Sequence, residues 1–324
     1  MLPRRSVLTL LFMALFSNGI ALAQYPSRPV RIVVPFLPGA APDLLARLVA
    51  DGLSKKLGQP VVVENKSGAN GNIGGEDIAR SPADGHALLF AVQASIVISP
   101  HLYKLPYDPL KDFVAVASLA SNQYLLAVNN DLPVRTLNEF VDLAKQSKQP
   151  LIYSSSGIGS QQHLAMEILM KRAGIPRMVH IPYKGASAAA AAMMAGEVVA
   201  GFSGSAVYEP VKAGRLRGIA MTGRARSETL PQIPTIAESY PGYQVEVWFG
   251  LMARTGTPDA IVSRLSEAVK DLLAQPDFVK RMQSSGSVDV LDLPRAEFAA
   301  LIRADYEKYG RIISELGLTG SSEQ

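Results

Sequence analysis

The sequence predicts an α/β protein built from two similar units. Strand-like apolar runs alternate with amphipathic helical stretches in two separate blocks of the chain, which is the pattern of sheets with helices packed on their faces. The chain has 324 residues, 48% of them hydrophobic. That length exceeds the roughly 250–300 residues at which a single core usually stops growing, so we expect two domains.

The first block predicts three strands and two helices. Residues 30–36 form a strand-like run, and a short turn leads into a leucine-rich helix that Gly58 should end. We expect a short buried strand at residues 61–63, a helix at 72–80 and a third strand at 86–92. Strand and helix in this alternation favour a parallel sheet.

The second block begins near Ser121 and predicts a further α/β unit of the same kind. Strands are expected at residues 124–128, 151–153, 178–181, 198–202 and 216–222, with helices at 137–145, 161–172 and 186–195.

The last part of the chain predicts long amphipathic helices. One should have Thr257 as its cap and Pro258 at its first position, and the other should start at residues 292–294. No repeat, low-complexity tract or linker separates the blocks. We therefore expect two lobes joined by crossing strands rather than domains strung in series.

Residues 1–23 have the features of a secretory signal peptide. Arg4 and Arg5 supply the positive region, residues 7–16 the apolar region, and Ala21-Leu22-Ala23 a cleavage site, so cleavage is expected near Ala23. The apolar run is shorter than the roughly 20 residues of a spanning helix. Either the general or the twin-arginine export route is compatible with this segment.

Composition indicates how the chain is stabilised and disfavours one class of ligand. The chain contains no cysteine, so its stability in an oxidising compartment must come from packing rather than disulfides. Without the signal, 30 basic residues stand against 28 acidic ones, and no basic run is present. A nearly neutral chain of this kind gives no support for nucleic-acid binding.

Two strand-to-helix loops are the best candidates for binding a ligand. Residues 154–161 (SSSGIGSQ) would aim free backbone N–H groups and serine hydroxyls at a carboxylate, and a plain capped turn explains the same residues equally well. Residues 36–43 (FLPGAAPD) lie where open α/β sheets place ligands. In that loop Asp43 is expected to stabilise the helix dipole rather than to contact the ligand.

No catalytic, metal or cofactor site can be assembled. Residues 201–205 (GFSGS) lack the final glycine of a nucleophile elbow, and the loop at 157–162 lacks the third glycine of a dinucleotide fingerprint. The four histidines are scattered. We expect no enzyme activity, cofactor or metal, and the alternative is a secreted serine hydrolase that uses Ser203 or Ser156 with a nearby histidine.

The sequence resembles the Bug family of periplasmic receptors, the solute-binding components of tripartite tricarboxylate transport systems. The resemblance covers nearly the whole mature chain and is highly specific. It rests on YPSRP at 25–29, VPF at 34–36 followed by Pro38-Gly39, LGQPVVVEN at 57–65, GNIG at 71–74, LPYDPLKDF at 105–113, QHLA at 162–165, HIPYKG at 180–185, PTIAE at 234–238 and WFGL at 248–251.

This resemblance implies the two-lobed, type II-like fold of periplasmic binding proteins, with the ligand in the cleft between domains. Domain 1 would comprise residues 24–124 and 246–324, and domain 2 residues 125–245. The first strand-to-helix loop and two ordered waters would hold the ligand's carboxylate, helped by the loop of the second lobe. The contact residues implied by position are Pro38, Gly39, Ala40, Ala41, Gln93, Ala94, Ser95, Ser155, Ser156, Ser160, Gln161, Ser203, Gly204 and Ser205.

The chain departs from the family pattern at two places. Ala40 replaces a glycine of Pro-Gly-Gly, and Ser203-Gly204 stands where many relatives carry Asp-Asn. The missing acid disfavours an amino-acid ligand and favours a mono- or dicarboxylate. The resemblance further implies a monomer that serves membrane permease subunits or a sensor kinase.

Overall fold

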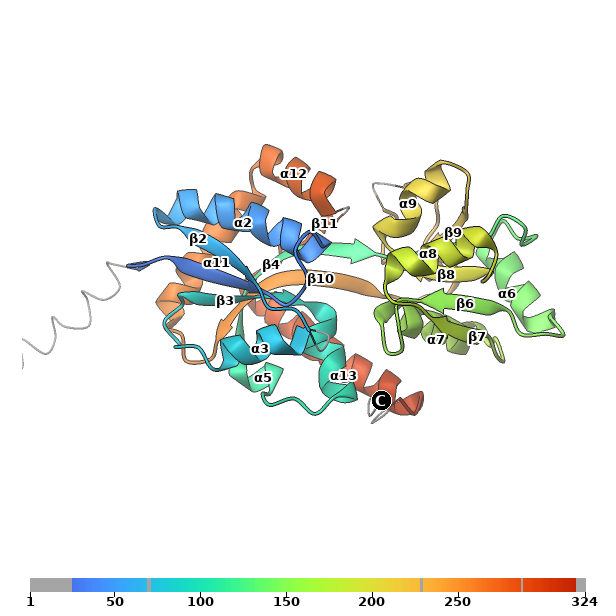
Figure 1. Ribbon diagram of the computed structural model, residues 1–324, viewed down its shortest axis with the longest axis horizontal. Helices are drawn as coiled ribbons and strands as arrows, with labels where there is room; N and C mark the ends of the chain where they lie inside the picture. Colours follow the sequence, from blue (N-terminus) through green and yellow to red (C-terminus); the bar gives the residue numbers. More distant parts are fainter. Residues whose placement is uncertain (1–24, 69–70, 228–229, 287, 319–324) are drawn as a thin grey trace, which may run out of the picture.

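The computed structural model describes residues 25–68, 71–227, 230–286 and 288–318. The predicted signal peptide lies outside the described residues. Two sheets, each with helices on both faces, form two lobes, and strands β4 and β10 run from the first lobe toward the second (Figure 1). The predicted α/β, two-lobed fold is therefore confirmed, although both sheets are mixed rather than parallel.

The first lobe contains a six-stranded sheet in the order β11-β4-β10-β3-β1-β2. The strand β1 pairs in parallel with β2 and β3, as predicted, whereas β10 pairs antiparallel with β3 and β4. The antiparallel pairs arise because β10 returns from the other lobe. The strands are β1 (Val30–Val34), β2 (Val61–Asn65), β3 (Ala87–Val92), β4 (Phe113–Gln123), β10 (Glu246–Arg254) and β11 (Asp289–Val290).

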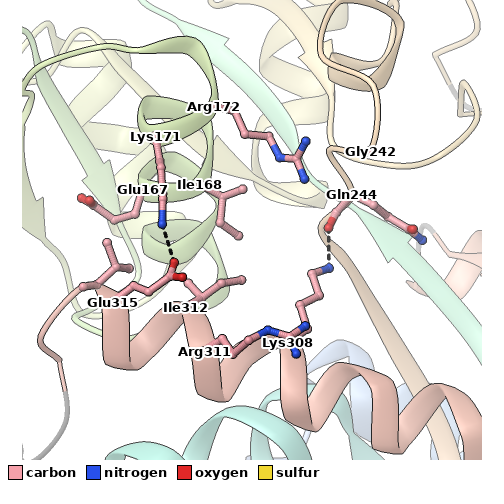
Figure 2. A pocket seen from close by; sticks show the side chains of 11 residues that line it. Glu167, Ile168, Lys171, Arg172, Gly242, Gln244, Lys308, Arg311, Ile312 and Glu315 are labelled. Atoms are coloured by element: carbon pink, nitrogen blue, oxygen red, sulfur yellow. Dashed lines mark hydrogen bonds and ion pairs between the residues drawn. The ribbon is translucent and has the colours of Figure 1, made fainter.

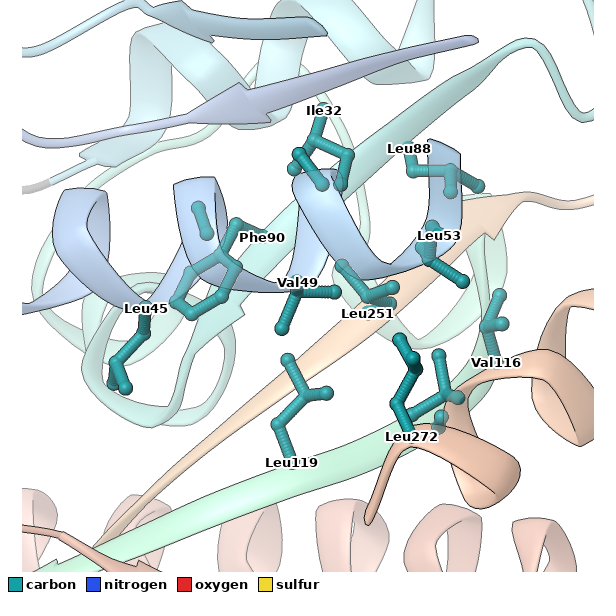
Figure 3. Close-up of a cluster of buried hydrophobic side chains, with 14 of the residues drawn as sticks. Ile32, Leu45, Val49, Leu53, Leu88, Phe90, Val116, Leu119, Leu251 and Leu272 are labelled. Carbon is teal, nitrogen blue, oxygen red and sulfur yellow. The ribbon is translucent and has the colours of Figure 1, made fainter. Parts of the chain in front are cut away.

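Helices cover both faces of this sheet. One face packs against α2 (Ala41–Leu57), α11 (Asp259–Leu273) and α12 (Pro276–Gly286), and Figure 3 shows the leucine, valine and phenylalanine side chains that fill the interface. The other face packs against α3 (Asn72–Ala79), the π-helix Ala94–Ile98, α4 (Ser99–Leu102) and α13 (Arg295–Glu315). The short α5 (Pro109–Asp112) precedes β4.

The second lobe contains a five-stranded sheet in the order β7-β6-β8-β5-β9. Its strands are β5 (Leu125–Val128), β6 (Ile152–Ser155), β7 (Val179–Pro182), β8 (Ala200–Ser203) and β9 (Arg217–Met221), of which β6, β7 and β8 run parallel. One face packs against α6 (Leu137–Gln146), α7 (Gln161–Ala173) and α10 (Ile236–Ser239). The other packs against α8 (Ala186–Ala195) and α9 (Ser205–Lys212).

Two segments cross between the lobes. Tyr124 connects β4 to β5, and Val245 precedes β10. Both are held to Thr222 of the second lobe, whose hydroxyl accepts from the Tyr124 N–H at 2.8 Å and whose carbonyl accepts from the Val245 N–H at 3.0 Å. The crossing strands are thus fixed to each other where they enter the second lobe.

Two local predictions were wrong. The strand near residue 62 is not buried, because β2 is an edge strand and Val62 is 49% exposed. The helix α11 begins at Asp259 with Pro258 as its cap residue, since the Thr257 hydroxyl donates to the Arg254 carbonyl instead of capping the helix. Within the residues the structure describes, no helix combines the length and apolar character needed to cross a membrane.

Candidate functional site

The first strand-to-helix loop, residues 36–41, is held in place by a buried carboxylate. Asp43 accepts hydrogen bonds from the Gly39 N–H (2.9 Å), Arg47 Nε (3.0 Å) and Asn65 Nδ2 (2.8 Å). Burial alone would raise the pKa of Asp43, but these bonds outweigh it and lower that pKa. Asp43 therefore holds the loop, and its oxygens are committed to partners inside the protein.

The tip of this loop is open to solvent. Leu37, Pro38 and Gly39 are exposed, and Gly39 has a φ of 81°, a conformation that glycine adopts without strain. The helix α2 that follows begins at Ala41 without any side-chain cap. Pro42 has no N–H and the Asp43 N–H donates to the Ala40 carbonyl at 2.9 Å, so the Ala41 N–H is the donor at this end of α2 that has no partner among the described residues, and the helix dipole favours an anion there.

The second strand-to-helix loop, residues 156–160, is more enclosed. Ser160 caps α7, its hydroxyl accepting from the His163 N–H at 3.3 Å. Ser156 donates to Gln162 Oε1 at 2.6 Å. Ser155 is fully buried, with its hydroxyl 2.6 Å from His180 Nε2 and 2.9 Å from the Gly157 carbonyl.

Three stacked aromatic rings pack beside this second loop. His163 and His180 lie parallel with ring centroids 4.1 Å apart, and Tyr153 stacks on His180 at 4.9 Å. His163 Nδ1 accepts from the Gly159 N–H at 3.1 Å. Burial, with a smaller contribution from His180, lowers the pKa of His163 to about 4, so the ring is neutral and can accept this bond at neutral pH.

The same loop is joined to the first lobe by a chain of side-chain hydrogen bonds. Gln161 Nε2 donates to Gln93 Oε1, and Gln93 Nε2 donates to Asp305 of α13. Trp248 Nε1 donates to the same carboxylate oxygen at 3.0 Å, and Tyr124 donates to Gln161 Oε1 at 3.2 Å. Gln93 and Gln161 were predicted as ligand contacts, and in this arrangement they are buried and bonded to each other.

The neighbouring candidates of the first lobe are also packed. Ala94 begins the π-helix, and Ser95 is buried and donates to the Val92 carbonyl at 2.8 Å. Across the boundary, the Gly159 Cα lies so close to Leu102 that an added Cβ would stand 2.5 Å from Leu102 Cδ1. The second loop therefore lies directly against the first lobe.

The third candidate segment, residues 203–205, contains a buried hydroxyl. Ser203 Oγ has no hydrogen-bond partner among the described residues, and Ser205 is exposed at the start of α9. A Cβ at Gly204 would lie 3.5 Å from Asn122 Nδ2 and 3.9 Å from Tyr124. This segment thus lies beside the crossing strand β4.

Tyr124, Asn122 and Asp305 connect these candidates but were missed by the sequence analysis. They lie on the crossing segment and on the last helix, remote in sequence from the loops they contact. Tyr124 touches both Gly204 and Gln161, so it links the second and third segments. No local motif marks such residues, because their role depends on the path of the chain between the lobes.

The hydrolase alternative finds no support in this geometry. Ser156 is bonded to Gln162, and Ser203 has no histidine partner in the described part of the chain. Ser155 does meet a histidine, but it is fully buried and His180 stacks on a second neutral ring. Among the described residues, no group of three or more histidine or acidic side chains could hold a metal ion.

Comparison with known proteins gives a consistent result. The family model described as "Tripartite tricarboxylate transporter family receptor" matches residues 45–318. Protein BugT of Bordetella pertussis is 32% identical over 297 residues, which cover 90% of each chain.

Two solved structures resemble the chain over nearly its whole length. Rpa4515 of R. palustris, solved with adipate, is 30% identical, with a TM-score of 0.78 over 91% of this chain and 99% of that one. MatC of Rhodopseudomonas palustris, solved with bound malate, is 29% identical, with a TM-score of 0.74 over 89% of this chain and 100% of the other.

Proposed function

Because the chain belongs to the tripartite tricarboxylate transporter receptor family, we propose that it captures a small mono- or dicarboxylate between its two lobes. The resemblance to the Bug family is confirmed by this membership. The chain is accordingly a periplasmic binding receptor and not an enzyme.

The observation that carries this proposal is the pair of helix N-termini at the two strand-to-helix loops. The exposed loop at residues 37–41 opens the uncapped helix α2, and the loop at 156–160 opens α7 against the first lobe. Helix N-termini bind anions through free N–H groups and the dipole. Similar proteins solved with adipate and with malate support a carboxylate as that anion.

The ligand is proposed to lack an amine. An ammonium group requires a carboxylate partner, and none of residues 37–41, 155–161 and 203–205 is acidic. Asp43, the nearest acid in sequence to the first loop, is buried and committed to Gly39, Arg47 and Asn65. A mono- or dicarboxylate without an amine therefore fits best.

The contact residues remain those predicted from the sequence. We assign the main contacts to Pro38–Ala41, Ser156, Ser160 and Ser205. Gln93–Ser95, Ser155, Gln161, Ser203 and Gly204 would reach the ligand only if the lobes shift, since all but Ala94 are buried in this arrangement. The domains are proposed as residues 24–124 with 246–324, and residues 125–245.

The proposed cellular setting follows from the family. We propose that residues 1–23 direct export and are removed near Ala23, and that the monomeric receptor serves membrane permease subunits of a tripartite transporter or a sensor kinase. Co-purification of the liganded receptor with permease subunits, against a sensor kinase as the competing partner, would decide between transport and signalling.

A thermal-shift screen of the mature protein tests the ligand class. Malate, succinate, adipate and acetate are compared with glutamate at equal concentration. A ligand at about 100 times its dissociation constant should stabilise the protein by about 2.7 kcal/mol, and glutamate should have no effect. A shift with glutamate alone would contradict the proposal.

A further inference from the structure

A cavity lies between the lobes, away from the three candidate loops. It has a volume of about 590 Å³ and is formed by α7 of the second lobe, α13 of the first lobe and the segment before β10 (Figure 2). None of the residues proposed to contact the carboxylate ligand lines it. We call this cavity the α7–α13 groove.

Basic side chains from both lobes surround the groove. Lys171 and Arg172 belong to α7, and Lys308 and Arg311 to α13. Two acids also line it, but Glu315 is paired with Lys171 at 2.5 Å, and Glu167 accepts from Tyr153 at 2.8 Å. Burial raises the pKa of Glu167, and the hydrogen bond from Tyr153 opposes that shift.

The remaining cations have no acid within ion-pairing distance among the described residues. Arg172 donates only to the Pro241 carbonyl at 2.9 Å, and Arg311 makes no hydrogen bond or ion pair there. Figure 2 shows Arg172 on one side of the groove and Lys308 and Arg311 on the other. Cations of both lobes therefore line one groove, and Arg172, Lys308 and Arg311 form no ion pair among the described residues.

The pKa of Lys308 depends on the charges around the groove. Its ammonium group donates to the Gln244 carbonyl at 2.7 Å and is half-buried. Burial lowers the pKa of Lys308, the charges of Asp305 and Glu246 oppose that shift, and Arg172 adds a smaller lowering. Lys308 and Arg172 both line the groove, from opposite lobes.

We propose that the α7–α13 groove is a second binding site, for a doubly charged oxyanion of the phosphate class, held between Arg172 of one lobe and Lys308 and Arg311 of the other. Three cations around one volume favour a compact ligand with several acceptor oxygens, and the planar guanidinium fork matches phosphate in two parallel hydrogen bonds. An anion bound there would bridge the lobes.

Titration calorimetry with inorganic phosphate tests this site on the mature protein. Sodium chloride holds the ionic strength constant, so that general screening does not imitate binding. We expect saturable binding of one phosphate per chain. Arg172→Gln and Arg311→Gln should each weaken it by about tenfold, the value of one lost charge-assisted hydrogen bond.

Two control variants test whether phosphate binds specifically in the groove. Arg215→Gln removes an exposed charge elsewhere on the second lobe and should leave phosphate affinity unchanged. Ser160→Asp alters the proposed carboxylate site and should also leave it unchanged. Absence of saturable binding by the wild type overturns the proposal, as does binding that Ser160→Asp abolishes and Arg172→Gln preserves. Because the probe is phosphate, failure of the carboxylate proposal would not affect this outcome.

Discussion

The two strand-to-helix loops occupy equivalent places in the two lobes but are built differently. The loop of the first lobe is exposed, its helix has no side-chain cap, and one buried carboxylate holds it from behind. The loop of the second lobe is capped by Ser160, supported by stacked histidines and hydrogen-bonded to the first lobe.

This difference indicates a division of roles. At the start of α2 no side chain competes with a ligand for the Ala41 N–H, whereas at the start of α7 the Ser160 hydroxyl already satisfies the His163 N–H. The first loop is thus suited to receive one charged end of the ligand, and the second to hold another carboxylate with its hydroxyl groups once the lobes are in place. The predictions below test this contrast, from the largest expected effect to the smallest.

Replacing Ser160 with Asp should abolish carboxylate binding and leave the fold intact. Aspartate caps helices as well as serine does, so stability without ligand should change little. A like charge a few ångströms from the ligand's carboxylate costs several kcal/mol at an intermediate dielectric, which lowers affinity by about a thousandfold or more. The measurement is the ligand-induced thermal shift.

Ser160→Asn is the matched control for that variant. Asparagine has the same shape as aspartate and also caps helices, but it is uncharged. It should retain most of the ligand-induced shift. An equal loss of the ligand-induced thermal shift in both variants would mean that the size of the new side chain, not its charge, prevents binding. An unchanged shift in Ser160→Asp would mean that this loop is a capped turn without a role in binding.

Mild acid should weaken the second loop before the first. The pKa of His163 is lowered to about 4, so its stabilising contribution is complete above the unfolded value near 6.5 and is lost as the pH falls toward 4. At pH 5 this loss amounts to about 2 kcal/mol. The raised pKa of Glu167 opposes it in part, because that group gains stability on protonation.

Denaturant unfolding at pH 7 and pH 5, with amide exchange, measures this effect. The native His163 ring is still mostly neutral at pH 5, so the lower free energy of unfolding, rather than loss of the acceptor, should make the Gly159 amide exchange faster there after correction for the intrinsic rate. His163→Asn, whose amide oxygen can still accept, should flatten the pH dependence. A variant that keeps the full wild-type dependence would assign it to another group.

The first loop should instead depend on the charge of Asp43. Because the pKa of Asp43 is lowered, its contribution is present above about pH 4 and is lost only in stronger acid. Asp43→Asn removes the ion pair with Arg47 and should cost about 1.5 kcal/mol in denaturant unfolding at pH 7. No change would show that Gly39 and Asn65 alone hold the loop.

Sequence reasoning found the elements whose signals are local. Gly58 does end α2 in a left-handed conformation, and the Ala-rich helix occupies residues 186–195 as expected. The long strands β4 and β10 were missed because both faces of a crossing strand are buried, which leaves no alternation to detect. Their pairing joins residues more than 100 positions apart.

For the same reason, only part of the candidate site could be predicted from the sequence. The loops at residues 36–43 and 154–161 could be recognised from a strand, small residues and a following helix. Asp305 could not, because the carboxylate that joins Gln93 to Trp248 comes from α13, 212 residues after Gln93. The exposure of a loop residue also depends on tertiary packing, and Ser155, chosen as a contact, is fully buried.

The smallest expected effect comes from exchanging the caps of the two helices. Ala40 and Ser160 both stand at the N-cap with extended backbones, φ −70° and ψ 157° against φ −64° and ψ 156°, so Ala40→Ser requires no change of backbone. The new hydroxyl would share the Asp43 N–H with the Ala40 carbonyl, to which it donates at 2.9 Å, whereas the Ser160 hydroxyl accepts from the His163 N–H. We expect Ala40→Ser to gain about 0.5 kcal/mol and Ser160→Ala to lose about 1 kcal/mol in denaturant unfolding. If the ligand's carboxylate binds the Ala41 N–H at the start of α2, the added hydroxyl crowds it, and Ala40→Ser should weaken ligand binding a few-fold while stabilising the free protein. Opposite signs in stability and affinity would locate the charged end of the ligand at the first loop. A gain in both would place it elsewhere, and the contrast between the two loops would then concern folding alone.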